Sequence, residues 1–274
     1  MEPGNRDRVS ILIRTIGRES LSRSLQAALA QLHRPFEIVI VNAAGGALPA
    51  LPPAEGVEVR IVEAPGSTRP HAANVALDNA RGDWLIFLDD DDSFAPEHVQ
   101  SLLAAARSAH AGVAYSSTLC LKDDGSADVV LGAPFDRVHL LHGNYIQIGA
   151  ALFASSLLAR GARFDESLIC LQDWDFWIQL SRLTHFAYTG RPTNHWRAYA
   201  GLSGAGMGAN ARPEATAPFR TQILRKWAVH ATALREKVRH HRDVAESSMR
   251  SGRSQAAQRH FAAAEQLAKG PVTA

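Results

Sequence analysis

The sequence has few cysteines, little net charge and no long apolar segment. Its 274 residues include only Cys120 and Cys170, too few for a disulfide framework or a zinc knuckle, so we expect buried free thiols. The 29 lysines and arginines nearly balance the 27 aspartates and glutamates, and a net charge of +2 gives no strong attraction to nucleic acid. No apolar run approaches the roughly 18 residues that span a bilayer. The polar start MEPGNRDR has no apolar signal-peptide region. We therefore expect a soluble, cytoplasmic protein that does not bind nucleic acid.

Strands and helices alternate along the first 110 residues. Short apolar runs predict strands at residues 9–13, 36–41, 57–62 and 83–88. Helical spacing of apolar residues predicts helices at residues 20–32, 69–80 and 96–109. A later strand is predicted at residues 145–153 and a helix at residues 173–183. The alternation favours an α/β fold with a mostly parallel sheet covered on both faces. In such sheets ligands bind beyond the carboxyl ends of the strands.

Four consecutive carboxylates, Asp89–Asp92, follow the apolar strand in the stretch WLIFLDDDDSF. Like charges at this spacing repel and resist desolvation, so the run is costly unless a cation binds there. One or two aspartates would suit the start of the next helix, but four exceed that need. Hard divalent ions such as Mg²⁺ and Mn²⁺ prefer carboxylate oxygens and accept phosphate oxygens as further ligands. The run therefore predicts a metal site and a phosphorylated substrate.

One class of enzyme with acids at a strand end is the haloacid-dehalogenase-like phosphatase. Its pattern D-x-D-x-[TV] is almost met by Asp89, Asp91 and Ser93. That class places its nucleophile near the start of its domain, whereas three predicted strands precede the motif here. That class also requires a downstream lysine and a further acidic pair, and the downstream cluster Lys122–Asp124 lies here in the turn-like stretch KDDGS. We keep this phosphatase as an alternative.

Another class matches more of the chain. The stretches VSILIRTIGR (residues 9–18), AALAQLHRPFEIVIVNAAGG (27–46), GSTRPHAANVALDNARGDWLIFLDDDD (66–92) and FDESLICLQDWDFWIQL (164–180) occur in order. Together they resemble the family-two glycosyltransferases of GT-A fold, over about residues 9–203. The resemblance implies a Rossmann-like sheet flanked by helices, with a catalytic domain at residues 1–215. Residues 216–274 form a predicted helical extension, in which Gly252, Ala257, Phe261 and Ala264 have the spacing of a tetratricopeptide-like hairpin.

The resemblance assigns roles to the acidic run. Asp91 would be the direct ligand of Mn²⁺ or Mg²⁺, and Asp90 would face the donor ribose or nucleotide. Asp89 and Asp92 would support them. The metal would neutralise the diphosphate of a nucleotide-sugar and stabilise it as a leaving group. His195 is a candidate for a further metal ligand, with a surface histidine as the alternative.

The resemblance also supplies a general base. Family members carry a Glu-Asp pair at the start of a helix, and the matching residues here are Gln172 and Asp173. Asp173 would take the proton of the acceptor hydroxyl as it attacks the anomeric carbon, and the reaction would invert configuration. The alternative is that Asp173 only caps its helix. Trp174 and Trp177 would stack on a sugar ring or pack in the core.

The donor pocket departs from the family pattern after the second predicted strand. The usual V-D-D-G-S is replaced by Val41–Gly45, which reads VNAAG. Asn42 can still donate and accept hydrogen bonds, but Ala43 cannot. The family's usual contact with uracil is therefore not assured by these residues, and the donor base stays open.

Four further positions complete the expected donor site. Arg14 and Thr15 stand in the turn after the first strand, where Arg14 would meet a phosphate or form a local ion pair. Arg69 matches a basic residue that approaches the donor, and Asn74 supports the same wall. The glycine-dense segment at residues 201–208 would close over the donor as a lid.

The expected partners follow from these roles. They are a nucleotide-diphosphate sugar donor and a saccharide or other hydroxyl acceptor, in polysaccharide biosynthesis. A non-catalytic glycosyltransferase-like binding module is a further alternative, because the VNAAG turn and Gln172 depart from the family pattern. The basic stretch at residues 235–242 is either a solvated helix face or a contact with a protein or an anionic membrane surface.

Overall fold

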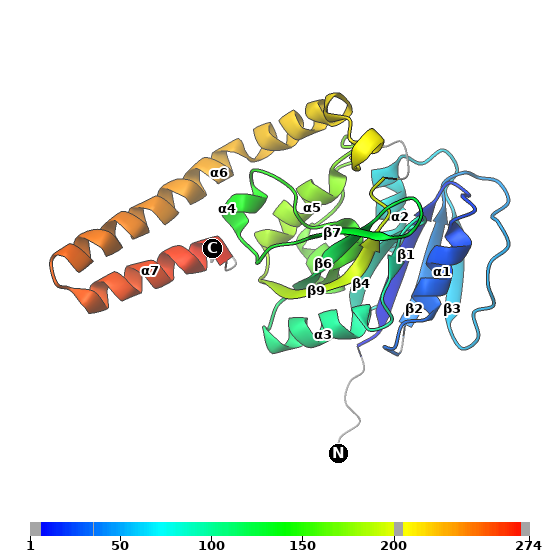
Figure 1. The fold of residues 1–274 in the computed structure, drawn as a ribbon, viewed down its shortest axis with the longest axis horizontal. Helices are drawn as coiled ribbons and strands as arrows, with labels where there is room; N and C mark the ends of the chain where they lie inside the picture. Colours follow the sequence, from blue (N-terminus) through cyan, green and yellow to red (C-terminus); the bar gives the residue numbers. More distant parts are fainter. Residues whose placement is uncertain (1–6, 35, 200–204, 270–274) are drawn as a thin grey trace, which may run out of the picture.

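The computed structural model describes residues 7–34, 36–199 and 205–269 (Figure 1). Its strands form a nine-stranded sheet in the order β3-β2-β1-β4-β8-β6-β9-β5, with β7 paired to β6. The strands are β1 (Val9–Thr15), β2 (Phe36–Asn42), β3 (Glu58–Glu63), β4 (Trp84–Asp89), β5 (Ser93–Phe94), β6 (Val113–Leu121), β7 (Ala127–Leu131), β8 (Ala151–Ala154) and β9 (Phe186–Trp196). The α-helices are α1 (Leu21–Leu29), α2 (Arg69–Asn79), α3 (His98–Ser108), α4 (Arg137–Leu140), α5 (Gln172–Ser181), α6 (Pro213–Arg250) and α7 (Ser254–Lys269).

The half of the sheet built from β3, β2, β1 and β4 is parallel, as the alternation of strands and helices predicts. Every residue of β1 and β2 is buried, because helices cover both faces of these strands. The register places Thr15 beside Asn42 and Arg14 beside Asp89. The carboxyl ends of β1, β2 and β4 therefore lie at the same edge of the sheet.

The other half of the sheet is mixed, because β8 runs antiparallel to both β4 and β6 while β9 runs parallel to β6. The predicted strand at residues 145–153 is wrong for most of its length, since only the part from Ala151 onward joins β8. The backbone carbonyls before β8 accept hydrogen bonds from buried side chains instead of from a neighbouring strand. The Trp177 indole N–H donates to the Ile146 carbonyl at 2.9 Å. The His98 Nε2 donates to the Gly149 carbonyl at 3.0 Å.

Two apolar clusters fill the two sides of the sheet. One joins the sheet to α1 and α3, and the other joins it to α2 and α5. Trp174 and Trp177 belong to the second cluster and are fully buried, with their indole N–H groups bonded to backbone carbonyls. Both tryptophans are therefore core residues, and neither is placed to stack on a sugar.

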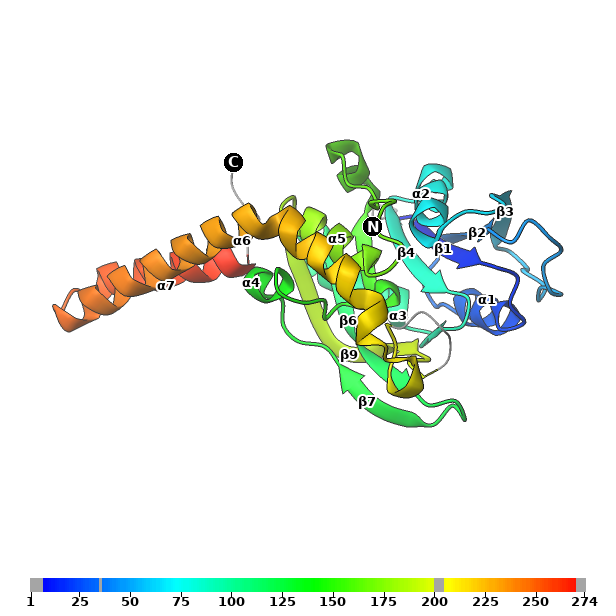
Figure 2. The ribbon, with the colours of Figure 1, turned by 90° about the horizontal axis from the view of Figure 1, so that it is seen from above.

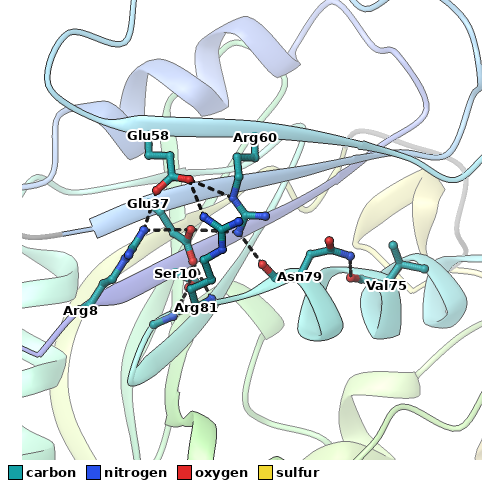
Figure 3. A network of polar contacts seen from close by, with 9 residues as sticks. Arg8, Ser10, Glu37, Glu58, Arg60, Val75, Asn79 and Arg81 are labelled. Carbon is teal, nitrogen blue, oxygen red and sulfur yellow. Dashed lines mark hydrogen bonds and ion pairs between the residues drawn. The ribbon is translucent and has the colours of Figure 1, made fainter.

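A network of ion pairs around the buried Glu37 lies at the opposite, amino-terminal end of the parallel strands (Figure 3). The Glu37 carboxylate accepts hydrogen bonds from the Ser10 hydroxyl at 2.6 Å and the Arg81 backbone N–H at 2.7 Å. Its second oxygen accepts from the guanidinium groups of Arg60 at 3.0 Å and Arg8 at 3.2 Å. Burial raises the pKa of Glu37, but the hydrogen bonds from Ser10, Arg81 and Arg60 outweigh it and hold the pKa below the usual value.

The last two helices form a long hairpin that projects from the body of the molecule (Figures 1 and 2). The start of α6 packs on α5, where the Trp227 indole donates to the Asp175 carboxylate at 2.7 Å. Further along, α7 runs back against α6 and buries Ala257, Ala264 and Ala268. α6 begins two residues before the predicted domain boundary, and the division into two domains stays a prediction. Within the described residues, no helix combines the length and apolarity needed to cross a membrane.

Candidate active site

A cleft of about 430 Å³ opens at the carboxyl ends of the parallel strands. One wall carries the acidic run after β4, and the other carries the start of α5. The lining includes Arg14, Thr15, Arg18, Ala43, Arg69, Asp89, Asp90, Asp91, Asn144, Gln172, Asp173, Trp196 and Arg197. The structure thus brings together, in one cavity, most of the residues that the sequence predicts for the site.

Neighbouring β1 holds the first two carboxylates of the acidic wall. Because Arg14 and Asp89 pair in register, the Arg14 guanidinium reaches the Asp89 carboxylate at 2.5 Å. Of the two roles expected of Arg14, the local ion pair is therefore formed, and contact with a phosphate stays a prediction. Burial raises the pKa of Asp89, but Arg14 and Arg69 outweigh it and hold the pKa below its usual value. The Thr15 hydroxyl donates to Asp90 at 2.6 Å.

Arg18 is a site residue that the sequence reasoning missed. Gly17 has a φ of +81°, and this turn directs the Arg18 side chain back toward the acidic wall. Its Nη1 lies 2.8 Å from an Asp90 oxygen and 3.1 Å from an Asp91 oxygen. Arg18 therefore bridges two of the four carboxylates. One feature of the sequence indicates this role: Arg18 lies in the turn after β1, and β1 is the neighbour of β4, which ends in the acidic run.

The last two carboxylates of the run carry less compensating charge. Burial and the neighbouring Asp89 raise the pKa of Asp91 to about 6. Burial and Asp91 raise the pKa of Asp92 well above its usual value, although its carboxylate accepts the Arg197 backbone N–H at 2.9 Å. The Asp92 carbonyl accepts from the Ser24 hydroxyl at 2.7 Å, which fixes the turn. Asp92 therefore supports the wall, whereas Asp91 lines the cleft.

The donor set of this wall fits a hard divalent cation. Across the described ranges, no three histidine, cysteine, aspartate or glutamate side chains are arranged as a metal cage. Mg²⁺ and Mn²⁺ do not require one, because they are commonly held by one or two carboxylates, substrate phosphates and water. Asp91 offers such a carboxylate, and its pKa is raised by burial and by the neighbouring carboxylates, both of which a bound cation would offset.

Asp173 occupies the opposite wall, in the first turn of α5. Asn144 donates to its carboxylate at 3.0 Å and the Trp174 backbone N–H donates at 2.9 Å. Burial nevertheless raises the pKa of Asp173 to about 6; Asp89 raises it further, and Arg14 lowers it. Both sides of the cleft therefore act on this carboxylate. Asn144, which orients it, is a second residue that the sequence reasoning missed.

Two predicted donor-site residues, Asn42 and Asn74, do not line the cleft and instead form hydrogen bonds that fix nearby backbone. The Asn42 amide donates to the Gly46 carbonyl at 2.8 Å and to Glu63 at 2.9 Å, which pins the turn after β2. The Asn74 side chain exchanges two hydrogen bonds of 3.0 Å with the backbone of Phe164. Both amides are occupied by the protein itself, so neither is placed to contact a donor directly.

His195 is likewise not brought to the cleft. It lies in β9 opposite Ser93 of β5, and side chains alternate between the faces of a strand. The next residue, Trp196, lines the cleft. Burial lowers the pKa of His195, and the nearby Glu97 opposes this shift. His195 therefore lies on the α3 side of the strand, and we leave it out of the metal site.

The predicted lid at residues 201–208 lies partly outside the described residues, which resume at Ala205. The described part is closely packed. The Met207 N–H donates to the Ala198 carbonyl at 2.7 Å, and a Cβ on Gly206 would lie 2.3 Å from the same oxygen. Ala205 and Asn210 line the cleft. Closure of this segment over a ligand stays a prediction.

Sequence comparisons place the chain among glycosyltransferases. The sequence profile of glycosyl transferase family 2 matches residues 10–146, which is half of the 274-residue chain. An uncharacterized glycosyltransferase, YwdF of Bacillus subtilis, is 34% identical over 99 residues, covering 35% of this chain and 37% of YwdF. The succinoglycan biosynthesis protein ExoO of Rhizobium meliloti is 30% identical over 110 residues, covering 39% of this chain and 32% of ExoO. The match thus spans about a third of each relative.

Solved structures share the fold over nearly the whole chain. Residues 1–349 of S. aureus TarS, in complex with UDP-GlcNAc, align with a TM-score of 0.56 and 13% identity, covering 94% of this chain and 92% of that one. The mannosyltransferase PcManGT from Pyrobaculum calidifontis, in complex with GDP-Man and Mn²⁺, aligns with a TM-score of 0.52 and 16% identity, covering 96% and 87%. At such identities the likeness shows the fold, and the predicted GT-A architecture is confirmed. With half of its residues matched by the family profile, this chain belongs to glycosyl transferase family 2.

Proposed function

We propose that this protein is a metal-dependent, inverting glycosyltransferase that moves a sugar from a nucleotide-diphosphate donor to a hydroxyl of a saccharide acceptor. The observation that carries the proposal is one cleft with two kinds of carboxylate on facing walls. Asp89–Asp91 form the acidic wall, and Asp173 stands on the other with a pKa raised to about 6. The nucleotide-sugars bound by TarS and PcManGT support the donor class.

The donor diphosphate would lie along the acidic wall. Arg69 and Arg18 line this part of the cleft and provide positive charge for phosphate oxygens. Asp91 would hold Mg²⁺ or Mn²⁺, with Asp90 directed to the ribose or nucleotide and Asp89 held in place by Arg14. The metal would supply Lewis-acid stabilisation of the leaving diphosphate. Asn42 and Asn74 would act indirectly, through the loops that they hold.

Asp173 would act as the general base. Its carboxylate takes the proton of the acceptor hydroxyl while the hydroxyl oxygen forms a bond to the anomeric carbon. The bond between that carbon and the diphosphate oxygen breaks, and its electron pair leaves with the nucleoside diphosphate. Attack from the side opposite the leaving group inverts the configuration. Asn144 would keep the carboxylate oriented toward the acceptor.

The donor is tested by thermal unfolding with a panel of nucleoside diphosphates, with and without Mn²⁺. A ligand that binds only the folded state raises its melting temperature, so no acceptor needs to be known. We expect one diphosphate to stabilise the wild type only with metal, and to lose this effect in Asp91→Ala. Absence of any metal-dependent shift would leave the chain as a non-catalytic binding module.

The base is tested with Asp173→Asn. The matched control is Glu19→Gln, because Glu19 is exposed and does not line the cleft. We expect Asp173→Asn to lower transfer by at least about 100-fold, a usual contribution of a general base, while donor binding stays near that of the wild type. Glu19→Gln should keep both. Loss of donor binding together with transfer would remove Asp173 from the role of base.

The phosphatase alternative lacks its lysine. Lys122 lies in the β6–β7 turn, 3.7 Å from Asp128, and is not among the residues that line the cleft. We therefore do not propose phosphoester hydrolysis. The similarity to ExoO supports a place in polysaccharide biosynthesis, with the sugar and acceptor still to be assigned.

A further inference from the structure

A second cavity of about 530 Å³ lies between α5 and the start of α6. Its polar lining comes from Arg160, Arg163, Asp165, Gln179, Arg182 and Lys226. The helix α5 starts at the proposed active site and ends beside this cavity. At 1.5 Å per residue, Arg182 lies about 14 Å along the helix from Asp173. The cavity is therefore separate from the cleft that would hold the donor diphosphate.

Two of the four basic residues in this cavity already have carboxylate partners. Lys226 lies 2.7 Å from Asp165 and 3.0 Å from the buried Asp175. Arg163 forms an ion pair with Asp78. These contacts are structural, because they join α6 to α5 and the preceding loop to α2. The positive charge that remains for a ligand is that of the other two arginines.

Arg160 and Arg182 contact no carboxylate anywhere in the described part of the chain. Arg160 gives one of its five N–H donors to the Leu183 carbonyl, at 2.7 Å. Arg182 lies over the Trp227 ring, 5.4 Å from its centre. The Trp227 side chain is 8% exposed, and its indole bond to Asp175 fixes the ring. A guanidinium on a fixed aromatic face keeps its edge donors open in a planar fork.

The two acids near this cavity, Asp165 and Asp175, are already paired with Lys226, so they do not neutralise Arg182. His230 lies on α6 one turn after Trp227, and its buried Nε2 has no hydrogen-bond partner among the described residues. Burial lowers the pKa of His230, and repulsion from Arg182, Arg137 and Lys237 lowers it further. Burial is the larger cause of this shift, and the repulsive part of it agrees with an excess of positive charge beside Arg182 that favours an anion.

We propose that this cavity is a second ligand site that binds a phosphate or diphosphate group through Arg160 and Arg182. Phosphate oxygens match the planar donor forks of arginine, and Trp227, Phe164 and Leu183 provide an apolar floor beside them. Capping of the α5 carboxyl end explains the bond from Arg160 to Leu183. Arg182 is the C-cap residue of α5 through its backbone N–H, but this role does not involve its guanidinium, which contacts the Trp227 ring. The proposal does not depend on the glycosyl transfer proposed above.

Calorimetric titration with inorganic pyrophosphate, in EDTA, tests the site. The test variant is Arg160→Gln/Arg182→Gln, and the matched control is Arg225→Gln, an exposed arginine of α6 outside the cavity. Arginines of the donor cleft also attract pyrophosphate, so the comparison is between variants. We expect the double variant to lose one binding event or weaken it by about tenfold or more, while the control keeps it. Equal titrations of all three proteins would overturn the proposal.

Two further measurements complete the test. Thermal unfolding shows whether the double variant is folded, and Arg182→Gln alone replaces it if it is not. Sedimentation with phosphatidylcholine vesicles containing phosphatidic acid then identifies the source of the phosphate. Loss of vesicle binding in the double variant would assign a lipid headgroup, whereas loss of pyrophosphate binding alone would assign a soluble phosphorylated ligand. Both results support the site, and retention of both kinds of binding contradicts it.

Discussion

Arg18 makes its two ion pairs with carboxylates of the proposed metal site. Its Nη1 lies between Asp90 and Asp91, where a divalent cation would also lie if it used the same oxygens. Both the guanidinium and the metal satisfy the same need of the acidic wall for positive charge. At the scale of single residues, Arg18 is therefore expected to compete with the metal until a diphosphate arrives to accept its donors.

This competition predicts that Arg18→Gln binds Mn²⁺ more tightly than the wild type in the absence of donor. Two partly exposed ion pairs are lost, each worth up to about 1 kcal/mol, so we expect a gain of about fivefold. Electron paramagnetic resonance of free Mn²⁺ measures it. Arg23→Gln is the matched control, because Arg23 reaches only the backbone oxygen of Asp91. Weaker Mn²⁺ binding by Arg18→Gln would show that Arg18 supports the metal.

The raised pKa of Asp173 predicts the pH dependence of transfer. A base with a pKa of about 6 is protonated and inactive below that pH, so kcat should rise about tenfold per pH unit up to about 6 and then level off. The measurement uses saturating donor and metal. Asn144 donates to the carboxylate and lowers its pKa, so Asn144→Ala should move the rise to higher pH. A flat profile from pH 5 to 8 would contradict the assignment.

The sequence predicted residues whose role depends on their own position along the chain. Asp91 follows a buried strand and Asp173 begins a helix, and each needs only its own element to reach the cleft. Arg18 and Asn144 were missed because their roles depend on which segments face them across the cavity. Asn74 matches a polar position of the family pattern and Asn42 stands where the family has an aspartate, but both amides bond to other parts of the protein.

At the scale of elements, Arg137 links the hairpin to the sheet domain. It is fully buried on α4 and has no carboxylate partner in the ranges that the structure describes. Its guanidinium donates to the Ser181 carbonyl at 2.6 Å, at the end of α5, and to the Leu267 carbonyl at 2.8 Å, in the last turn of α7. Burial lowers its pKa to about 10, so it stays charged. The charge is stabilised by the negative ends of two helices.

Arg137→Met is expected to loosen this junction. It keeps side-chain length but leaves the Ser181 and Leu267 carbonyls without their donor, which we expect to cost about 3 kcal/mol of unfolding free energy. Urea unfolding measures the cost, and hydrogen exchange should show α7 opening before the sheet. Arg239→Met, an exposed change on α6, should leave both unchanged. Unaltered exchange in α7 would mean that apolar packing alone holds the hairpin.

Strands were predictable where burial on both faces makes them continuous apolar runs. β1, β2 and β4 are apolar runs in a covered parallel sheet, and they were found. β9 was missed because it contains Gly190, Arg191 and Pro192, which weaken any strand pattern, and because its pairing with β6 shifts register there. Such irregular strands form through partners that are distant in the sequence.

At the scale of the whole molecule, carboxylates at the two ends of the parallel strands have opposite effects on stability. Glu37 at the amino ends has four donors and a lowered pKa, so its charged form stabilises the fold. Asp173 at the carboxyl ends has a raised pKa, so its charged form destabilises the fold. The protein would thus keep an unfavourable charge at its proposed site and a favourable one at the opposite end.

Urea unfolding of Glu37→Gln and Asp173→Asn across pH 4 to 8 separates these two effects. The stability from Glu37 is complete above its unfolded pKa of 4.5 and is lost as pH falls through its lower folded pKa. Glu37→Gln should therefore cost about 3 kcal/mol at pH 8 and less toward pH 4.

Asp173 binds its proton more tightly in the folded state, so wild-type stability falls as pH rises from about 4 to 6. Asp173→Asn escapes this loss and should be more stable than wild type by about 1–2 kcal/mol at pH 8, with no difference near pH 4. An Asp173→Asn protein that is less stable than wild type at pH 8 would mean that Asp173 is a structural cap, because a cap contributes most when it is charged.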